Sequence, residues 1–507
     1  MQKFLLIILD GFGLRDEREG NAVAQANTPN LDRLLNECPL SKIETSGKFV
    51  GLPDGIMGNS EVGHMNMGAG RIVRQDLVRI NDSVESDDLK NNPQLQEVFQ
   101  HVKSNDSTLH IMGLLSDAGV HSHLSHFKYI LSNARDLGVK KIALHAFMDG
   151  RDTSPTSGIE YINQFESWIE PDEGYKIATI CGRYFAMDRD TRWDRIESAY
   201  KMLIHSEGEK YTDAVSAIQA SYDAKITDEF VRPAIIGEPS PMQNGDAVLS
   251  MNFRADRMRQ IVTVINGSNF PHFSTIPLEI LFTCMTQYKE EFPYPALFSP
   301  EKISNIFPEI LAQNNYRQLR IAETEKYAHV TYFFNGGSEQ SFSGESRILI
   351  PSPQVATYDL HPEMSAHEVT EEVLSAMESD KYEAIIMNFA NPDMVGHTGN
   401  LMAAISAIET IDTCLGKIQL SAKDKQAAIF LTADHGNLEL MRDPQTGCVH
   451  TAHTTLPVPL ILDGINGNYQ LAETGKLADI APTILDFLNI PKPTEMTGKS
   501  LLVSDNG

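Results

Sequence analysis

The fold class that this 507-residue sequence predicts is α/β, with mainly parallel sheets. Short apolar runs of strand length alternate with longer helix-like stretches from one end of the chain to the other. The alternation continues without an internal repeat or a low-complexity tract. Because chemistry in such sheets gathers at the carboxyl ends of strands, we expect the functional residues there.

Each predicted strand is a short apolar run, and each predicted helix is one of the longer stretches between the runs. The strands are expected at residues 4–9, 109–115, 142–148, 176–181, 247–252, 279–284, 384–388, 427–432 and 460–462. The clearest helices are expected at residues 124–137, 192–205, 257–265, 366–377 and 402–418. A polar stretch at 81–93 and a proline-rich stretch at 292–300 are typical of connections. They could divide three consecutive domains or bracket one inserted domain.

The chain is strongly acidic, with a formal net charge of −26 at pH 7. A surface of that charge repels nucleic acid and anionic membranes, so we expect neither as a partner. A small-molecule anionic substrate is compatible with this charge only where arginines gather locally against it.

Cysteine usage favours a reducing compartment. The five cysteines are scattered and no Cys-x-x-Cys pair occurs, so neither a disulfide framework nor a cysteine zinc site is expected. The N-terminal apolar run is too short for a signal peptide, and no run approaches the roughly 18 residues of a membrane span. We therefore expect a soluble, cytoplasmic protein.

Aspartates follow two clear strands, in positions suited to binding a metal ion. Asp10 ends the first strand, and Gly11 after it permits a tight turn. Asp434 follows the strand at 427–432 and stands directly before His435. Taken alone, an Asp-Gly pair is more often a turn or a helix cap.

A second group of candidate ligands lies nearer the C-terminus. Asp393 and His397 are four residues apart, so a helical turn after Pro392 would place both on one side. One such pair is expected by chance in this chain, and His453 alone is typical of an ordinary loop histidine. Together with the strand-end residues, however, these side chains supply mixed oxygen and nitrogen ligands for two divalent ions. Such a set suits Mn²⁺, Zn²⁺ or Fe²⁺.

Ser60 is flanked by glycines in the segment Gly58-Asn59-Ser60-Glu61-Val62-Gly63, which lets the backbone expose its hydroxyl. The pattern is not Gly-x-Ser-x-Gly, so an α/β-hydrolase elbow is not indicated. A serine is a poor nucleophile until a base or a metal lowers its pKa, and a neighbouring metal would do so. On this motif alone, a simple serine of a glycine-rich loop is the alternative.

Five arginines follow strands in the middle of the acidic chain. They are Arg151, Arg183, Arg189, Arg254 and Arg257, with His121 and Asp152 in the same segments. Guanidinium groups bind phosphate and carboxylate through paired hydrogen bonds. Surface ion pairs with the interleaved aspartates would explain any one arginine, but the repeated placement after strands favours an anion-binding site.

Taken together, the motifs resemble the cofactor-independent phosphoglycerate mutases of the alkaline-phosphatase-like superfamily. The resemblance covers essentially the whole chain and is carried by residues 9–13, 58–64, 322–327, 434–437 and 451–454. Departures from the family pattern are small. Ser154 stands where relatives often have proline, and Phe389 stands where tyrosine is common.

The resemblance implies two divalent ions, most simply Mn²⁺, and a phosphoserine formed on Ser60. One ion would be bound by Asp393, His397 and His453, and the other by Asp10, Ser60, Asp434 and His435. The implied catalytic residues are Ser60, Asp152 and Lys326. The implied substrate-binding residues are His121, Arg151, Asp152, Arg183, Arg189, Arg254, Arg257 and Lys326.

For the whole chain, the resemblance implies a monomeric isomerase that interconverts 3-phosphoglycerate and 2-phosphoglycerate without 2,3-bisphosphoglycerate. Residues 1–74 and 302–507 would form a discontinuous metal-binding, phosphatase-like domain. Residues 75–301 would form an inserted α/β phosphotransferase domain that binds the substrate. Since an exposed phosphoserine would hydrolyse, this inserted domain is expected to close and exclude water.

Two other classes are compatible with parts of the pattern. A related two-metal phosphatase, sulfatase or phosphopentomutase could use the same ligands, but it would not need this arginine set. A catalytically silent metal- or anion-binding protein is the other alternative. Such a protein would be expected to lack at least one of Asp10, Ser60 or Asp434, and all three are present.

Overall fold

A computed structural model describes residues 1–267, 270–464 and 469–503 of the chain. The chain forms two compact units: unit 1 contains Met1–Gln75 and Lys302–Gly507, and unit 2 contains Asp76–Glu301. Each unit has its own eight-stranded sheet and its own hydrophobic core. Within the described ranges, every helix is too short or too polar to traverse a bilayer.

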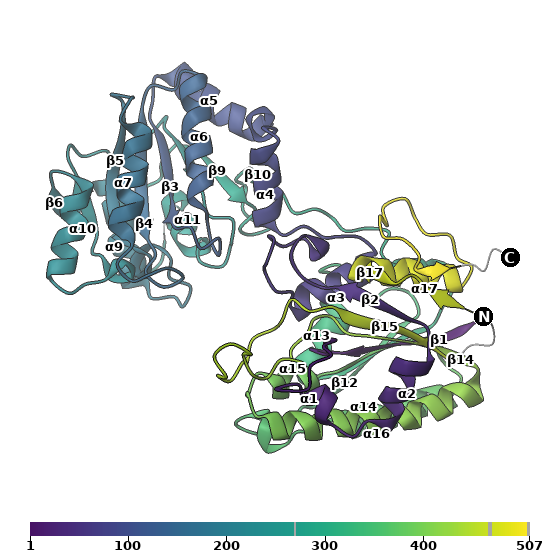
Figure 1. Ribbon diagram of the computed structural model, residues 1–507. Coiled ribbons are helices and arrows are strands. Elements are labelled where there is room, and N and C mark those ends of the chain that lie inside the picture. The colour runs from purple at the N-terminus through teal and green to yellow at the C-terminus, as the bar shows by residue number, and fades with distance from the viewer. Residues whose placement is uncertain (268–269, 465–468, 504–507) are drawn as a thin grey trace. The chain divides into compact units, whose positions relative to one another are not determined.

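Unit 1 is built on a sheet with the strand order β12-β11-β13-β1-β14-β15-β2-β17 (Figure 1). Its central strand β1 (Lys3–Leu9) has two parallel neighbours, β13 (Ala384–Phe389) and β14 (Ala427–Thr432). Beyond β14, the strand β15 (Val458–Asp463) runs antiparallel to both β14 and β2 (Leu40–Glu44). The carboxyl ends of β1, β13 and β14 therefore meet at one edge of the sheet.

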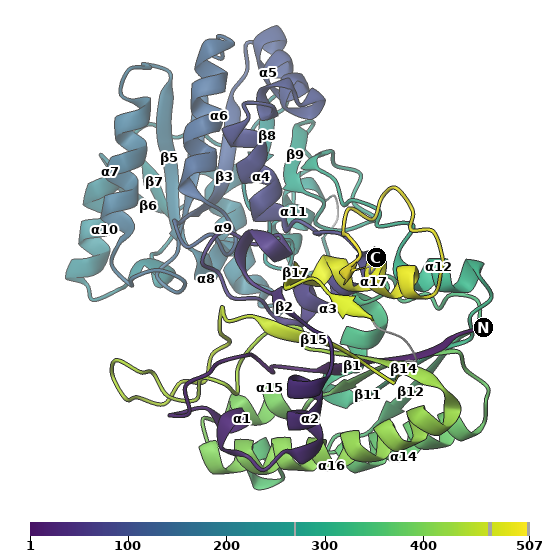
Figure 2. The same ribbon diagram turned by 45° about the vertical axis from the view of Figure 1, so that its right-hand side comes forward.

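Helices cover both faces of this sheet. The long helices α14 (Ala366–Glu378) and α16 (Leu401–Lys425) lie side by side on one face, and α3 (Ser60–Ala69) and α17 (Ile480–Phe487) lie on the other (Figures 1 and 2). Burial on both faces explains why residues 4–9 form a continuous apolar run rather than an alternating one.

The other elements of unit 1 complete the sheet and its connections. The strands are β11 (Gln318–Glu323), β12 (Glu345–Ile350), β16 (Gln470–Leu471), β17 (Thr474–Lys476) and β18 (Leu502–Val503). The helices are α1 (Ala22–Gln25), α2 (Pro29–Glu37), α12 (Phe307–Gln313), α13 (Thr324–Ala328) and α15 (Asn391–Gly396). Short helical turns are η1 (Gly47–Val50), the π-helical turn η4 (His329–Phe333), η5 (Tyr358–Leu360) and η6 (Leu477–Asp479).

Unit 2 has the strand order β10-β9-β8-β3-β4-β5-β7-β6, and most neighbouring pairs are parallel. Its strands are β3 (Leu109–Leu115), β4 (Ile142–Met148), β5 (Tyr175–Gly182), β6 (Glu209–Tyr211), β7 (Ala234–Ile236), β8 (Ala247–Ser250), β9 (Leu281–Thr286) and β10 (Ala296–Phe298). Its helices and turns are α4 (Asp76–Glu85), η2 (Leu89–Asn91), α5 (Pro93–Asn105), α6 (Leu124–Asp136), α7 (Gly158–Ile169), α8 (Arg183–Ala186), α9 (Trp193–His205), α10 (Ala214–Asp223), η3 (Asp228–Phe230) and α11 (Arg259–Asn266).

Alternation along the strands of unit 2 divides its core between the two faces of the sheet. Ile111 and Leu115 of β3 pack with α5, α6 and α7, whereas Met112 and Leu114 pack with α9 and α11. This division follows from the two-residue period of a strand.

The α/β class with mainly parallel sheets is as predicted, but two details of the prediction are wrong. The polar stretch at 81–93 is not a plain connection, because α4 continues to Glu85 and η2 follows it. The proline-rich stretch at 292–300 contains the edge strand β10. The stretch at 81–93 covers only the polar end of α4, and β10 has just three residues between Pro295 and Pro300, so neither shows a clear period in the sequence.

Candidate active site

Three carboxylates gather at the edge of the unit 1 sheet where β1, β13 and β14 end. Asp10 directly follows β1, Asp393 lies in the first turn of α15 after β13, and Asp434 follows β14. All three are buried, with exposed fractions of 0%, 3% and 0% respectively. Three buried carboxylates in one place are costly unless cations balance them.

One lysine supplies part of the balancing charge. Lys326, on the short helix α13 after β11, lies 2.7 Å from Asp10 and 2.6 Å from Asp393 through its Nζ atom. Burial opposes the charge on Lys326, but the two carboxylates outweigh it and raise the lysine pKa. Lys326 is therefore a buried, permanently charged ammonium group.

Ser60 is the first residue of α3, and its hydroxyl lies at the centre of this group. The Oγ atom donates to Asp10 Oδ1 at 3.0 Å, lies 3.1 Å from His435 Nε2, and accepts from Lys326 Nζ at 2.8 Å. The preceding residue, Asn59, caps the helix by accepting the N–H of Val62. A helix N-terminus favours negative charge, so α3 presents its positive end at the serine.

The histidines are held in a tautomer that turns Nε2 toward the carboxylates. The Nδ1 atoms of His397 and His453 each lie 2.8 Å from a backbone carbonyl oxygen, which only accepts hydrogen bonds. Each neutral ring therefore carries its proton on Nδ1 and a lone pair on Nε2. The two Nε2 atoms lie 3.2 Å apart, and each is 3.1 Å from Asp393 Oδ1.

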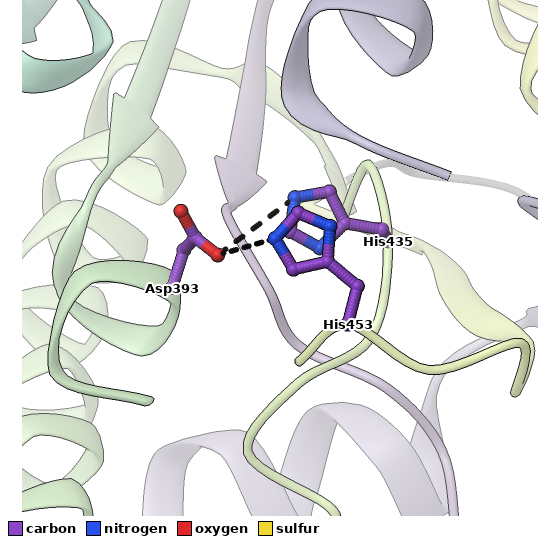
Figure 3. Close-up of side chains that lie close together, drawn as sticks. All are labelled: Asp393, His435 and His453. Atoms are coloured by element: carbon purple, nitrogen blue, oxygen red, sulfur yellow. Dashed lines mark hydrogen bonds and ion pairs between the residues drawn. The ribbon is translucent and has the colours of Figure 1, made fainter. Parts of the chain in front are cut away.

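His435 stands between the two groups of potential ligands. Its ring stacks on that of His453 with centroids 3.7 Å apart, and both rings turn toward the same oxygen of Asp393 (Figure 3). Its Nε2 atom is 3.5 Å from Asp10 Oδ1 and 3.6 Å from Asp434 Oδ2. The ligand atoms of Asp393, His435 and His453 converge on one point, and those of Asp10, Asp434 and His435 converge on another.

This arrangement fits divalent metal ions. Acceptor atoms facing one another repel unless a cation lies among them, and Lys326 alone does not balance three carboxylates. Asp434 Oδ2 is buried and forms no well-aligned hydrogen bond with the described residues, although His64 Nδ1 lies 3.3 Å away. Burial acts to raise the pKa of Asp434, but the charges of His435, His64 and Lys326 hold it below its usual value. The oxygen and nitrogen donors suit a borderline or hard divalent ion.

Two further residues support the site without having been singled out from the sequence. His64 Nδ1 lies 2.8 Å from the Ser60 carbonyl oxygen and 3.3 Å from Asp434 Oδ2. Asn388, near the end of β13, donates to Asp10 Oδ2 at 2.8 Å. The signal for His64 was its four-residue spacing from Ser60 on a helix, which places both on one face.

The arginine-rich segments of unit 2 form a second polar site. Arg183, which begins α8 after β5, is 3% exposed and donates to Asp149 at 2.7 Å and to Asp152 at 2.5 Å. Its other nitrogen, Nη2, lies 2.9 Å from His121 Nε2. Burial first, and then the neighbouring arginines, lower the pKa of His121 to about 4. His121 is thus a neutral acceptor at pH 7.

The other arginines of this set make fewer hydrogen bonds to the protein than Arg183 does. Arg189 and Arg254 both contact Asp256, at 2.9 Å and 3.0 Å, and Arg257 donates to the Met187 carbonyl oxygen at 3.1 Å. Burial lowers the pKa of Arg257, and the nearby Arg183, Arg189 and Arg151 add to that effect. Arg257 is therefore close enough to three other guanidinium groups to be repelled by them, as expected of a site for an anion.

Asp152 is paired with an arginine that is distant in sequence. Its sequence neighbour Arg151 points toward Glu229, at 3.7 Å, and Arg183 is the cation that contacts Asp152. The side chains of these neighbouring loop residues diverge, and Arg183 reaches Asp152 from a different strand end.

The α/β fold and the paired oxygen–nitrogen donor sets define a metal-dependent enzyme. The family model of the Metalloenzyme superfamily matches residues 2–492. The 2,3-bisphosphoglycerate-independent phosphoglycerate mutase of Clostridium botulinum (strain ATCC 19397 / Type A) is 49% identical, with 98% of this chain and 99% of that protein covered. The 2,3-bisphosphoglycerate-independent phosphoglycerate mutase 2 of Methanosarcina acetivorans is also 49% identical, over 99% of this chain and 97% of that protein.

A solved structure extends the similarity. A crystal structure of the Leishmania mexicana phosphoglycerate mutase, determined at low cobalt concentration, aligns with a TM-score of 0.66 and 30% identity. It covers 99% of this chain and 98% of the other. The chain belongs to the family of 2,3-bisphosphoglycerate-independent phosphoglycerate mutases. The expected family, the α/β fold class and the enzyme class, an isomerase, are thereby confirmed.

Proposed function

We propose that this chain interconverts 3-phosphoglycerate and 2-phosphoglycerate without 2,3-bisphosphoglycerate, by passing the phosphoryl group through Ser60. Family membership supports this function. The single observation that carries the mechanism is the position of the Ser60 hydroxyl. It is within 3.1 Å of Asp10, His435 and Lys326, between the two sets of metal-ligand atoms.

The proposed metal centre uses the residues inferred from the sequence. One ion would be held by Asp393, His397 and His453, with His435 also facing this group. The other would be held by Asp10, Ser60, Asp434 and His435. When bound, divalent ions supply Lewis-acid chemistry, which lowers the pKa of a serine hydroxyl and offsets the negative charge of a phosphoryl group. Mn²⁺ is the proposed ion, since imidazole and carboxylate donors without thiolate suit it.

In the proposed first half-reaction, Ser60 Oγ attacks the phosphorus of 3-phosphoglycerate and the substrate's own oxygen leaves. Lys326 donates to Ser60 Oγ, so its ammonium group is placed to neutralise charge on the transferring phosphoryl group. The N-terminus of α3 adds a favourable dipole at the same place. Catalysis of this kind depends on positioning and electrostatics more than on covalent chemistry by the protein.

The arginine-rich site of unit 2 is the proposed binding site for glycerate. Arg189, Arg254 and Arg257 would bind the carboxylate and phosphate groups, and the other predicted substrate residues are Arg151, Arg183 and His121. Asp152 is the proposed general acid and base for the two glycerate hydroxyls, held in place by Arg183 at 2.5 Å. His121, neutral at pH 7, can accept a hydrogen bond without adding charge.

We further propose that unit 1 is the metal-binding phosphatase-like domain and unit 2 the inserted phosphotransferase domain. In the second half-reaction the retained glycerate presents its other hydroxyl to the phosphoserine, and the product is 2-phosphoglycerate. Retention of glycerate and exclusion of water separate a mutase from a phosphatase. The scattered free cysteines support a reducing cytoplasm, and the family resemblance supports a monomer.

The test is to incubate the purified chain with 3-phosphoglycerate and Mn²⁺, then follow 2-phosphoglycerate and free phosphate together. We expect isomerisation at a rate unaffected by added 2,3-bisphosphoglycerate, with little free phosphate. A strict requirement for 2,3-bisphosphoglycerate would contradict the proposal. Release of phosphate in step with substrate loss would instead indicate a phosphatase.

A further inference from the structure

Glu439 is a buried carboxylate that joins three separate loops of unit 1. Its Oε2 atom accepts the backbone N–H of Gly13 at 3.0 Å and that of Asn437 at 2.8 Å. Its Oε1 atom accepts the hydroxyl hydrogen of Thr454. Glu439 is 0% exposed and makes no ion pair with the described residues, so these three hydrogen bonds are what offsets its burial.

Each of the three partners stands within about three residues of a proposed metal ligand on the same loop. Gly13 follows Asp10 on the loop after β1, and Asn437 follows His435 on the loop after β14. Thr454 is the neighbour of His453 on the segment before β15, and its N–H donates to the Gly436 carbonyl oxygen at 3.0 Å. The contacts of one side chain therefore link loops that are more than 400 residues apart in sequence.

The position of Glu439 explains why residues 13 and 436 are both glycine. A Cβ atom on Gly13 would lie 2.3 Å from Glu439 Cδ, and one on Gly436 would lie 2.3 Å from Glu439 Oε1. Neither glycine has a left-handed backbone. Their lack of a side chain is therefore required by space and not by backbone conformation. The loops approach as closely as they do because glycine leaves room for Glu439 between them.

We propose that Glu439 is a positioning residue for the metal centre, and that it sets the spacing of the loops bearing Asp10, His435 and His453. This inference rests on the proposed function, because it takes those residues as ligands. Groups that orient metal ligands through hydrogen bonds typically change metal affinity 10- to 100-fold when they are removed. Glu439 differs from an ordinary group of this kind because it acts on three ligand-bearing loops at once.

Two substitutions of Glu439 distinguish an effect of its hydrogen bonds from an effect of its negative charge. Glutamine at 439 could keep both backbone N–H groups on its amide oxygen. Its amide nitrogen could then donate to the Thr454 hydroxyl, which accepts as well as donates. Glu439→Gln therefore removes the negative charge but preserves the three links. Glu439→Ala removes both the charge and the links.

The experiment measures Mn²⁺ binding to the full-length chain by calorimetry, with thermal unfolding of the metal-free protein as a folding control. Glu439→Ala is expected to weaken Mn²⁺ binding about 10- to 100-fold, and Glu439→Gln by no more than about threefold. Glu345 offers a matched control, because its carboxylate is also buried in unit 1 but contacts Asn335, Phe342 and Arg347 instead. Glu345→Ala is expected to lower the Tm while leaving Mn²⁺ affinity within about threefold of wild type.

Three outcomes would overturn the positioning role: unchanged Mn²⁺ affinity in Glu439→Ala, equal weakening in Glu439→Gln and Glu439→Ala, or equal weakening in Glu345→Ala. If Glu439→Ala does not fold, Thr454→Val removes the hydroxyl that links Glu439 to the His453 loop, together with the acceptor for the Leu456 N–H at 3.3 Å, and leaves the links to Gly13 and Asn437 in place. Thr454→Val is expected to lower the affinity for one of the two Mn²⁺ ions. Unchanged affinity for both ions would count against the proposal. Failure of the wild-type chain to bind Mn²⁺ would overturn the metal centre itself, which distinguishes the two proposals.

Discussion

At the scale of single residues, the Ser60 hydroxyl differs from an ordinary loop serine in its surroundings. It contacts a carboxylate, an imidazole and an ammonium group, and all of these are buried. We expect Ser60→Ala to lower mutase kcat by at least about 10⁴-fold, because removal of a nucleophile leaves only the residual effect of binding. The fold should be unaffected, and the Tm and the rate of 2-phosphoglycerate formation check both points.

The exposed serine Ser86 provides the control for this substitution, since it lies on unit 2 and contacts Asp88. Ser86→Ala is expected to retain wild-type activity. Substantial turnover by Ser60→Ala, with a native Tm, would mean that another group carries the phosphoryl moiety.

Asp149 is a second residue whose effect can be measured. It accepts from Arg183 Nη1 at 2.7 Å, from the N–H groups of Arg151 and Asp152, and from the Ser116 hydroxyl at 2.7 Å. A hydrogen bond to a charged group contributes about 1.5–3 kcal/mol, so we expect Asp149→Asn to raise KM for phosphoglycerate about tenfold or more. The effect on kcat should be smaller, and steady-state kinetics separate the two.

Asp136, an exposed residue of α6, serves as the comparison. Asp136→Asn should leave KM unchanged. A wild-type KM in Asp149→Asn would show that Arg183 and the loop after β4 hold their positions without this carboxylate.

Sequence motifs revealed the residues with reactive side chains but not those that hold them in place. Asp10 and Asp434 follow strands and stand near glycines, and Ser60 lies between Gly58 and Gly63, which are recognisable local patterns. Glu439 has no such pattern, because its partners come from three distant segments. Tertiary contacts of this kind leave no periodic signal in the sequence.

At the scale of secondary structure, the position of α3 depends on two of its glycines. A Cβ atom on Gly63 would lie 2.8 Å from Asp434 Cβ, and one on Gly68 would lie 1.9 Å from the Phe334 carbonyl oxygen. Glycine therefore lets α3 approach the ligand loop and the π-helical turn closely enough for Ser60 to reach the site.

We expect Gly68→Ala to destabilise unit 1 by about 1–3 kcal/mol, as overpacking of a close contact does. It should also lower kcat about 100-fold, because the helix must shift and carries Ser60 with it. Thermal unfolding and kinetics test the two effects. Glu61→Ala, at an exposed position of the same helix, should change neither, and a wild-type Tm in Gly68→Ala would show that α3 has more room than the backbone indicates.

Buried apolar strands were the elements that the sequence predicted best. β3, β4 and β14 have the expected bounds, because each is a mostly apolar run that is buried throughout. β11 was missed although all six of its residues are buried, since Gln318, Arg320 and Glu323 interrupt its apolar pattern. Arg320 packs over the Phe334 ring at 4.9 Å, a tertiary contact that sequence periodicity does not reveal.

At the scale of the whole molecule, metal removal is expected to change both activity and stability. Without metal, Lys326 opposes the charges of Asp10 and Asp393, and Asp434 is opposed by His435, His64 and Lys326. A chelator should abolish isomerisation, and Mn²⁺ at 100 times its Kd should stabilise the chain by about 2.7 kcal/mol for each bound ion. Calorimetric unfolding with and without Mn²⁺ measures this. Full activity in the presence of a chelator would contradict a metal-dependent mechanism.

The pH dependence of stability follows from buried histidines. Burial lowers the pKa of His126 to about 3 and that of His329 to about 3, and it lowers the pKa of His121 to about 4. The unfolded chain binds protons at these sites below about pH 6.5 while the folded chain does not. The contribution of these three neutral histidines to the free energy of unfolding is therefore fully present above pH 6.5. It is lost progressively as the pH falls toward 3.

We expect the Tm of the chelated protein to begin falling near pH 6.5, and His126→Gln to show a shallower fall. His361 is half-exposed and close to Glu363, so His361→Gln is the comparison and should follow the wild-type curve. A Tm that is constant from pH 7 to pH 5 would contradict this assignment.

The central place of β1 in its sheet governs the order in which the chain can fold during synthesis. Its parallel partners β13 and β14 end at Phe389 and Thr432. About 400 residues must therefore be synthesised after β1 before it can pair with either neighbour. At 5–20 residues per second, their synthesis takes about 20–80 s. Unit 2, whose residues are contiguous, can be complete on the ribosome long before then. The nascent chain thus carries the apolar strand β1 without its pairing partners for most of translation. We therefore expect it to bind chaperones that shield nascent apolar segments.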